Sequence, residues 1–408
     1  MKKKLFSKTM LIFVVFALVF AFAFAGFSSC NPDTGNGIEK DDLDDDVDYP
    51  DYDNVTIKPF TETTATALVN KMTVGWNLGN TLDAGYPTWL SNPTLTQIET
   101  AWVSHKTNKA NIDALKTAGF NAIRIPVSWH KCVDNEYKIR KDWMDRVTEI
   151  VGYAVSNDMY IILNTHHDED IFKFMDKDMA KSLPAFKRIW KQIALAFRGH
   201  DEKLIFEALN EPRTKGSSNE WGGGTPEEHK NLNKYYQAFV DTVRATGDNN
   251  KKRILMVNTY AASADDAAIK GLTIPTDSAK NCIIVSIHSY SPYNFALNTN
   301  AAYNTWNESG SNKTDITSGI DRAHTAFTSG KGIPVIIGEF GAMNKNNDDA
   351  RALWAEFYVK HAKTKGMPCF WWDNAHFTGD GEKFGLLNRT NNSFTYPKIV
   401  EGLMDGLK

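Results

Sequence analysis

The sequence predicts an α/β fold of the (β/α)8 TIM-barrel type that forms one domain. Eight short segments are rich in Ile, Val and Leu and are continuously apolar, as parallel strands covered on both faces are. Amphipathic segments with helical spacing lie between them, and polar residues gather where the apolar segments end. In a barrel of this type the C-terminal ends of the strands meet at one face, and functional sites lie there.

The expected elements follow in order along the chain. Strands are expected at residues 72–77, 121–127, 159–166, 203–211, 253–260, 282–290, 333–340 and 367–374. Helices are expected at residues 111–118, 143–155, 186–197, 227–246, 319–328, 350–363 and 397–407. A doubly wound open sheet is the competing architecture, and it usually carries a Gly-rich phosphate loop after its first strand. Residues 75–81 lack the spacing of that loop, which favours the barrel.

The composition fits one large core and a neutral ligand. The chain has 408 residues, a formal charge of -3 and 42% apolar residues. The near-neutral balance argues against nucleic acid or an anionic membrane surface as the main partner. The 11 Trp and 14 Tyr residues suit a neutral, hydroxylated ligand on which flat rings can stack.

The N-terminus has the pattern of an export signal. Residues 2–4 are lysines, residues 10–27 are an almost unbroken apolar run, and Cys30 follows two serines. This resembles a bacterial lipoprotein signal, in which the chain is cut before Cys30 and the cysteine is lipidated. We therefore expect residues 1–30 to be a signal peptide with a lipobox, and a protein anchored by lipid alone at the cell surface or in the periplasm. An ordinary cleaved signal with secretion and an uncleaved anchor are the alternatives.

Residues 31–58 are expected to form an acidic, disordered linker, and residues 59–408 the folded domain. The linker contains the run DDLDDDVD at 41–48 and has too few apolar residues for a packed core. In the domain, Cys132, Cys282 and Cys369 are odd in number and lack CxxC spacing. Neither a disulfide framework nor a zinc site is indicated.

Two glutamates end two of the apolar runs. Glu211 lies in an Asn-Glu-Pro sequence after the fourth run, and Glu339 follows the apolar residues 335–338 in the seventh. Burying an unpaired carboxylate costs several kcal/mol, so a glutamate at the polar end of a strand serves chemistry more often than packing. Two of them on different strands suit glycosidic bond cleavage, with one as acid/base and one as nucleophile or base. The alternative for each glutamate is that it is an ordinary loop residue or one half of an ion pair.

Other polar residues at the strand ends complete a possible site. They are Asn77, Asn80, Arg124, His166, His167, Asn210, His288, Tyr290, Trp372 and Asp373. Arg124 lies inside its strand and needs a carboxylate partner; Glu339 is the natural candidate and would be kept ionised, as a nucleophile must be. Tyr290 is placed to donate to Glu339, and His288 to orient either Glu211 or a sugar hydroxyl. As general acid, Glu211 needs a raised pKa, from burial or from the charge of Glu339.

Aromatic rings and histidines carry further expectations. Trp371 and Trp372 must face opposite sides of their strand, and Trp372, which precedes Asp373, is assigned to the barrel mouth as a platform for a pyranose. The loop aromatics Tyr86, Trp89, Trp129, Trp221 and Trp306 are candidates for further sugar contacts. The run of residues 166–170 could bind a metal, but a barrel metallohydrolase needs further histidines on other strands. We expect no metal and no cofactor.

Together these segments resemble glycoside hydrolase family 5. They are GWNLGNTLDA at 75–84, IRIP at 123–126, NEP at 210–212, HSY at 288–290, GEFG at 338–341 and WWDN at 371–374. The resemblance covers about residue 60 to the C-terminus and is strongest to the bacterial endo-β-1,4-glucanase subfamily. It implies a clan A barrel with Glu211 as acid/base, Glu339 as nucleophile, net retention, and a cis peptide between Trp372 and Asp373.

The resemblance also implies supporting or substrate-binding residues. They are Asn77, Arg124, His166 or His167, Asn210, His288, Tyr290 and Trp372, with His166 favoured of the two histidines. We expect a monomeric, retaining endo-β-1,4-glucanase that cleaves cellulose-type, mixed-linkage or xyloglucan polysaccharides by double displacement. A β-mannanase on the same barrel, a non-catalytic glycan-binding lipoprotein and a metal-dependent hydrolase are the alternatives.

Overall fold

Eight parallel strands close into a barrel in the order of the sequence. The computed structural model describes residues 55–61 and 64–408, and all structural statements refer to these. The strands are β1 Val74–Leu78, β2 Ala122–Ile125, β3 Tyr160–Asn164, β4 Leu204–Glu207, β5 Leu255–Asn258, β6 Ile283–His288, β7 Val335–Phe340 and β8 Cys369–Asp373. A small antiparallel hairpin, β9 Leu387–Asn388 with β10 Ser393–Phe394, follows the barrel.

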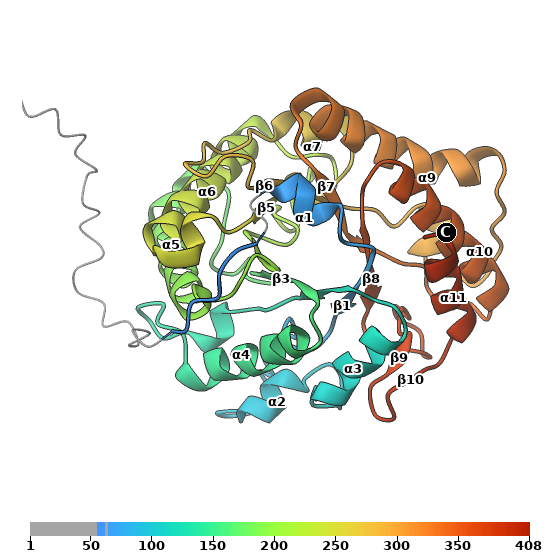
Figure 1. The fold of residues 1–408 in the computed structure, drawn as a ribbon, viewed down its shortest axis with the longest axis horizontal. Helices are drawn as coiled ribbons and strands as arrows, with labels where there is room; N and C mark the ends of the chain where they lie inside the picture. The colour runs from blue at the N-terminus through green and yellow to red at the C-terminus, as the bar shows by residue number, and fades with distance from the viewer. Residues whose placement is uncertain (1–54, 62–63) are drawn as a thin grey trace, which may run out of the picture. The chain divides into compact units, whose positions relative to one another are not determined.

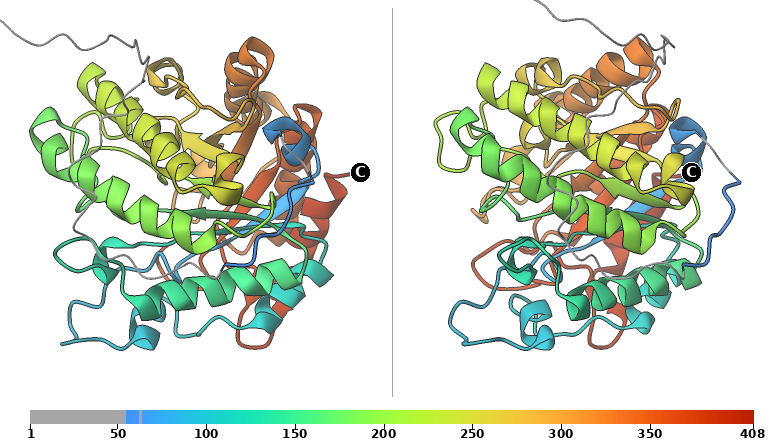
Figure 2. Two further views of the ribbon diagram at one scale, coloured as in Figure 1. Left: turned by 60° about the vertical axis from the view of Figure 1, so that its left-hand side comes forward. Right: turned by 90° about the vertical axis from the view of Figure 1, so that its left-hand side faces the viewer.

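Helices surround the strands (Figure 1). They are α1 Ala65–Val69, α2 Leu95–Glu99, α3 Lys109–Thr117, α4 Lys141–Ser156, α5 Asp176–Phe197, α6 Pro226–Ala245, α7 Asp266–Gly271, α8 Tyr293–Ala296, α9 Gly310–Ala323, α10 Asp348–Thr364 and α11 Pro397–Asp405. Figure 2 shows α4, α5 and α6 lying side by side along one flank of the barrel. Thr225 begins α6 with a capping box, because its hydroxyl accepts from the Glu228 N–H and the Glu228 carboxylate accepts in return.

The barrel interior is filled by alternate residues of the strands. Ile162, Ile205, Ile284 and Ile336 belong to one buried cluster with Phe370. Short helix α1 closes the bottom of the barrel, because its Ala65, Leu68 and Val69 belong to the same cluster. Gly75 has to be a glycine here, since a Cβ would lie 2.2 Å from the Phe370 ring.

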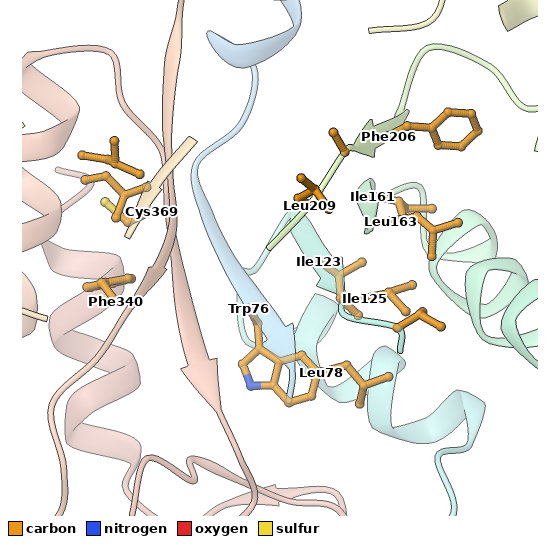
Figure 3. Packing of buried hydrophobic residues seen from close by; sticks show 14 of the residues in the cluster. Trp76, Leu78, Ile123, Ile125, Ile161, Leu163, Phe206, Leu209, Phe340 and Cys369 are labelled. Atoms are coloured by element: carbon orange, nitrogen blue, oxygen red, sulfur yellow. The ribbon is translucent and has the colours of Figure 1, made fainter. Parts of the chain in front are cut away.

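The opposite faces of the strands pack under the helices. Figure 3 shows Trp76, Ile123 and Leu163 among the buried side chains of this larger cluster. Removing such apolar surface from water contributes about 25 cal/mol per Å². Toward the C-terminal ends of the strands the interior residues become polar, and this polar layer supports the site described below.

The predicted barrel is confirmed, with a strand at each of the eight expected places. All seven predicted helices are present, but α5 begins earlier than expected, at Asp176, because the helix continues through Pro184. The short helices α1, α2, α7 and α8 were not predicted. Among the described residues, Cys132, Cys282 and Cys369 are buried and form no disulfide bond.

The predicted signal peptide, Cys30 and most of the linker lie outside the described residues. The last residues of the linker are described and contact the barrel. The Lys58 N–H donates to the Gly199 carbonyl at 2.9 Å, and the Asn249 side chain donates to the Lys58 carbonyl at 2.6 Å. No helix in the described ranges is both long and apolar enough to cross a bilayer.

Candidate active site

A cavity of about 900 Å³ opens at the C-terminal ends of the strands. Nine of the predicted site residues line it: Asn80, His166, His167, Asn210, Glu211, His288, Tyr290, Glu339 and Trp372. Asn77 and Arg124 are fully buried beneath these residues and do not line the cavity. The structure therefore separates the predicted set into residues that can touch a ligand and residues that support them.

Glu339, in β7, is held by two donors. Arg124 Nη1 donates to Oε1 at 2.7 Å, and the Tyr290 hydroxyl donates to Oε2 at 2.9 Å. Burial, reinforced by the charges of Glu339 and Glu211, raises the pKa of Tyr290 well above its ordinary value, so its hydroxyl keeps its proton. Both predicted partners of Glu339 are present, and each donates to one of its carboxylate oxygens.

Arg124 is fixed by three further side chains. Its Nε donates to Glu207 at 2.6 Å, its Nη1 to Asn77 Oδ1 at 3.0 Å, and its Nη2 to Asn210 Oδ1 at 2.7 Å. The last bond turns the amide oxygen of Asn210 toward Arg124 and its amino group away, so that this group is a donor on the cavity side. Arg124 thereby links the support layer to the cavity wall.

Asn77 has a supporting role alone. Its amino group donates to the carbonyls of Gly338, Phe370 and Trp371 at 3.0–3.3 Å, and its oxygen accepts from Arg124. Since β1 pairs with β2 and β8, Asn77 lies beside Arg124 and Trp372 in the sheet. It ties β1 to β2, β7 and β8 without reaching the cavity.

Glu211 lies opposite Glu339. His288 Nδ1 is 3.0 Å from Glu211 Oε1 and 3.6 Å from Glu339 Oε2. An oxygen of each glutamate and a ring nitrogen of His288 all lie within 4.8 Å of one another. Gly338 makes room for this contact, because a Cβ there would lie 3.0 Å from His288 Nε2.

The expected raised pKa of Glu211 is wrong for this arrangement of side chains. Burial raises the pKa of Glu211, but the hydrogen bond and charge of His288 and the charges of Arg213 and His167 outweigh it and lower the pKa. Arg213 supplies a cation that the prediction for Glu211 did not include. Glu211 Oε1 and His288 Nδ1 lie within hydrogen-bond distance, at 3.0 Å.

The two neighbouring histidines occupy different parts of the wall. The His166 ring lies parallel to that of Trp372, with 5.7 Å between centroids and 2° between planes. Burial, with the charges of His167 and Arg124, lowers the pKa of His166 well below 6.5, so this ring is neutral. His167 lies 3.6 Å from Glu169, and its ring centroid is 5.8 Å from that of Trp102.

Trp372 faces the cavity and Trp371 faces the helices, as predicted. Trp371 is fully buried and meets Phe340 and Trp354 edge to face. The predicted cis peptide between Trp372 and Asp373 is wrong; within the described ranges, the cis bond lies between Ser291 and Pro292. The Asp373 carboxylate accepts hydrogen bonds from Trp76 Nε1 and from the backbone N–H of Leu386.

Sequence reasoning missed several residues of the site. Glu207, Asn164 and Asn258 form the support layer under Arg124, with Glu207 accepting from both asparagines at 3.0 Å. A charge inside the apolar strand β4 was the available signal for Glu207, as it was for Arg124 in β2. Arg213 and Glu382 also line the cavity.

The five predicted loop aromatics have different surroundings, and neither Tyr86 nor the exposed Trp89 lines the cavity. Trp221 lines the cavity and is 61% exposed, whereas Trp129 and Trp306 are buried, so the prediction of sugar contacts for these two is wrong. Trp102 and Tyr293 line the cavity and were not predicted. The Trp129 ring is held inside the fold, where its Nε1 donates to the Asn164 carbonyl at 2.9 Å.

The acidic run after His167 is divided among different partners. Asp168 accepts from the backbone of Trp129 and His130 at 2.8 and 2.7 Å. Glu169 pairs with Lys215 at 2.9 Å, so the run does not converge on one point. The chemistry of the cavity instead centres on two carboxylates. Glu339 is bound by a cation and a phenol, and Glu211 lies within hydrogen-bond distance of a histidine.

Comparison with known proteins agrees with this geometry. Residues 83–378 match the family described as Cellulase (glycosyl hydrolase family 5). The chain is 46% identical over 343 residues to Endoglucanase B of Neocallimastix patriciarum, covering 83% of this chain and 71% of that protein. It is 44% identical over 347 residues to Endoglucanase A of Clostridium longisporum, covering 84% of this chain and 66% of that protein.

Solved structures give the same result. A GH5-4 broad specificity endoglucanase from Ruminococcus champanellensis with bound cellotriose is 46% identical and superposes with a TM-score of 0.80, covering 85% of this chain and all of that one. A GH5 family lichenase from Caldicellulosiruptor sp. F32 is 42% identical, with a TM-score of 0.81 over 88% of this chain and all of that one. The predictions of the barrel and of a glycoside hydrolase of the endoglucanase type are confirmed, and the chain belongs to glycosyl hydrolase family 5.

Proposed function

We propose that the protein hydrolyses internal β-1,4-glucosidic bonds of β-glucans with retention of configuration, by double displacement on Glu339 and Glu211. The observation that carries this proposal is the closeness of the two carboxylates: one oxygen of Glu211 lies within 4.8 Å of one oxygen of Glu339. Retaining enzymes hold their carboxyl groups about 5–5.5 Å apart, whereas inverting enzymes need roughly 6.5–9.5 Å to admit a water molecule.

The first step uses both carboxylates at once. The carboxylate of Glu339, held in place by Arg124 and Tyr290, attacks the anomeric carbon. The bond to the leaving oxygen breaks through an oxocarbenium-like transition state, and that oxygen takes the proton supplied by Glu211. A glycosyl ester of Glu339 and a new free hydroxyl on the departing chain result.

The second step reverses these roles. Glu211, now without its proton, accepts one from a water molecule, which attacks the anomeric carbon of the ester. The bond to Glu339 breaks and the carboxylate is regenerated. His288, which touches both glutamates, keeps Glu211 aimed at the same point in both steps.

The substrate class follows from the cavity. It is lined by Trp102, Trp221, Tyr293 and Trp372, whose rings suit the apolar faces of pyranoses, and a related structure binds cellotriose while another is a lichenase. We propose soluble or amorphous β-glucans as substrates, such as carboxymethylcellulose, mixed-linkage β-glucan and xyloglucan. New reducing ends should be measured with the purified protein on these glucans and on mannan.

The same measurement separates the alternatives. Faster release from mannan than from every glucan would make the protein a β-mannanase. Binding to a glucan without turnover would make it a glycan-binding protein, whereas loss of activity with a chelator would indicate a metal-dependent hydrolase. The Glu339→Ala variant is the matched control, because it should still bind glucan and should release no reducing ends.

We also infer that the protein is exported and tethered as a lipoprotein. The basic start, the apolar residues 10–27 and Cys30 support this, and the acidic residues that follow support a flexible spacer. In the native host the mature protein should fractionate with membranes, and Cys30→Ser should release it or block its processing. A soluble mature form that lacks Cys30, recovered from the wild-type gene, would contradict the lipoprotein.

A further inference from the structure

Arg213 lies two residues after Glu211, and its guanidinium folds back onto that residue. Nη1 of Arg213 donates to the Glu211 carbonyl at 2.9 Å and lies 3.4 Å from Glu211 Oε2. The same nitrogen is 3.9 Å from Glu169. Glu211 therefore has His288 at one carboxylate oxygen and a permanent cation close to the other.

The loop between β4 and α6 holds Arg213 in this position. Arg213 Nε donates to Glu220 Oε1 at 3.1 Å, and Glu220 Oε2 accepts from the Gly216 N–H at 2.7 Å. The Trp221 ring lies 4.4 Å from the centre of the guanidinium, at the distance of a cation–π contact. With 9% of its side chain exposed, Arg213 is confined although it lines the cavity.

We propose that Arg213 is a positioning residue that aims the carboxyl group of Glu211 and sets the pH above which this group no longer supplies a proton. This inference rests on the proposed function, in which Glu211 is the acid/base. In this proposal Arg213 contacts Glu211 and touches neither the sugar nor the leaving oxygen; it acts through Glu211. The exposed Trp221 that stacks on it provides the neighbouring platform for a sugar.

The sign of the effect follows from the charges around Glu211. The groups that face it are His288 and Tyr290 from β6 and its following loop, Glu339 from β7, His167 and Glu169 after β3, Glu382 after β8, and Arg213. Among them, Arg213 carries the charge that does not titrate. A nearby cation favours loss of a proton from the pair formed by Glu211 and His288, and this holds for a proton on either residue. Arg213 should therefore lower the pH at which the pair loses its proton.

Removal of this charge should therefore be visible in the pH profile. The basic limb of kcat/KM reports the proton that the acid must hold in the free enzyme. We expect Arg213→Met to move this limb upward by roughly half to one pH unit on a β-1,4-glucan oligosaccharide, since a charge at this distance shifts a pKa by about a unit. Arg213→Lys should restore most of the wild-type position.

Two controls separate the charge effect from a structural one. Arg140→Met removes a cation that pairs with Asp142 on the surface, and it should leave the basic limb in place. The second control is an aryl cellobioside whose leaving group is a strongly acidic phenol. This phenol leaves without being protonated, so kcat/KM on this substrate should fall only slightly as pH rises, and by the same amount in Arg213→Met and in wild type. A variant with generally damaged structure would lose activity on both substrates.

The outcomes are distinct. An unmoved basic limb in folded Arg213→Met, with Glu211→Gln inactive on glucan and active on the aryl substrate, overturns this inference and leaves the proposed function in place. Full activity of Glu211→Gln on glucan overturns the proposed function itself. If Arg213→Met does not fold, Arg213→Gln replaces it, because glutamine keeps a hydrogen-bond donor and removes the charge. The position of its basic limb of kcat/KM then decides the outcome in the same way.

Discussion

Arg124 Nε lies 2.6 Å from Glu207 Oε2, and neither side chain is exposed to solvent. The same guanidinium reaches Glu339 at 2.7 Å, so one cation serves two carboxylates on different strands. Burying these charges is costly unless each is paired and hydrogen-bonded. Glu207 also accepts from Asn164 and Asn258, and this satisfied network fixes the direction in which Arg124 meets the nucleophile.

Glu207→Gln should lower both stability and turnover. The change removes one charge from the network and frees Arg124 to shift, so we expect a loss of roughly 1–3 kcal/mol in the free energy of unfolding and a fall in kcat of at least about tenfold. Glu99→Gln is the matched control, because Glu99 pairs with Arg146 at 2.7 Å in an equally buried position. Urea unfolding and kcat on glucan should be measured for both. If Glu207→Gln and Glu99→Gln lose the same stability and have the same kcat, Glu207 has only a structural role.

Trp372→Phe should weaken catalysis more than it weakens the fold. Its ring faces the cavity and stacks on His166, so a smaller ring should lower kcat/KM by roughly 30- to 100-fold, which is about 2–3 kcal/mol of transition-state stabilisation. Trp371→Phe, on the outer side of the same strand, should lower Tm and leave kcat/KM within about threefold of wild type. The test is to measure kcat/KM and Tm for both variants. A larger loss of kcat/KM in Trp371→Phe than in Trp372→Phe would contradict the assignment of Trp372 to the sugar.

His200 should make the fold sensitive to mild acid. Burial, with the charges of Arg253 and Lys58, lowers the pKa of His200 to about 4, below its ordinary value of 6.5. As pH falls from 6.5 to about 4, the unfolded chain binds a proton at this residue before the folded protein does, so stability is lost in this window. Because His200 is partly exposed, we expect a loss on the order of 2 kcal/mol.

The test is the pH dependence of unfolding in His200→Gln. The variant should be less sensitive to pH between 6.5 and 4 than wild type, and its kcat should be unchanged, since His200 lies at the bottom of the barrel. Identical slopes of unfolding free energy against pH in the two proteins would show that His200 does not contribute to the acid sensitivity.

The barrel and the two glutamates were predictable from the sequence for one reason. Parallel strands buried on both faces are continuous apolar runs, and a carboxylate at the end of such a run stands out. The pairing of Glu339 with Arg124 and Tyr290 was predictable too, because alternate residues of a strand share a face. The short helices α1 and α7 were not, since five or six residues carry too little periodicity to be recognised.

The remaining misses depend on contacts between distant parts of the chain. Trp129 and Trp306 look like surface aromatics in loops, but tertiary packing buries both. The lowered pKa of Glu211 depends first on its hydrogen bond with His288 and then on where the loop after β4 places Arg213, and no local pattern indicates the second. Glu207 was the avoidable miss, because its charge inside an apolar strand is the same signal that revealed Arg124.

The configuration of the first product tests the central claim most directly. A β-1,4-glucan oligosaccharide should be added to the enzyme and the anomeric proton of the new reducing end followed by NMR before mutarotation equilibrates it. Attack by Glu339 followed by attack of water inverts the carbon twice, so the β-anomer should appear first and the α-anomer only later. Initial appearance of the α-anomer would mean a single displacement by water, and would contradict the roles given to Glu211 and Glu339.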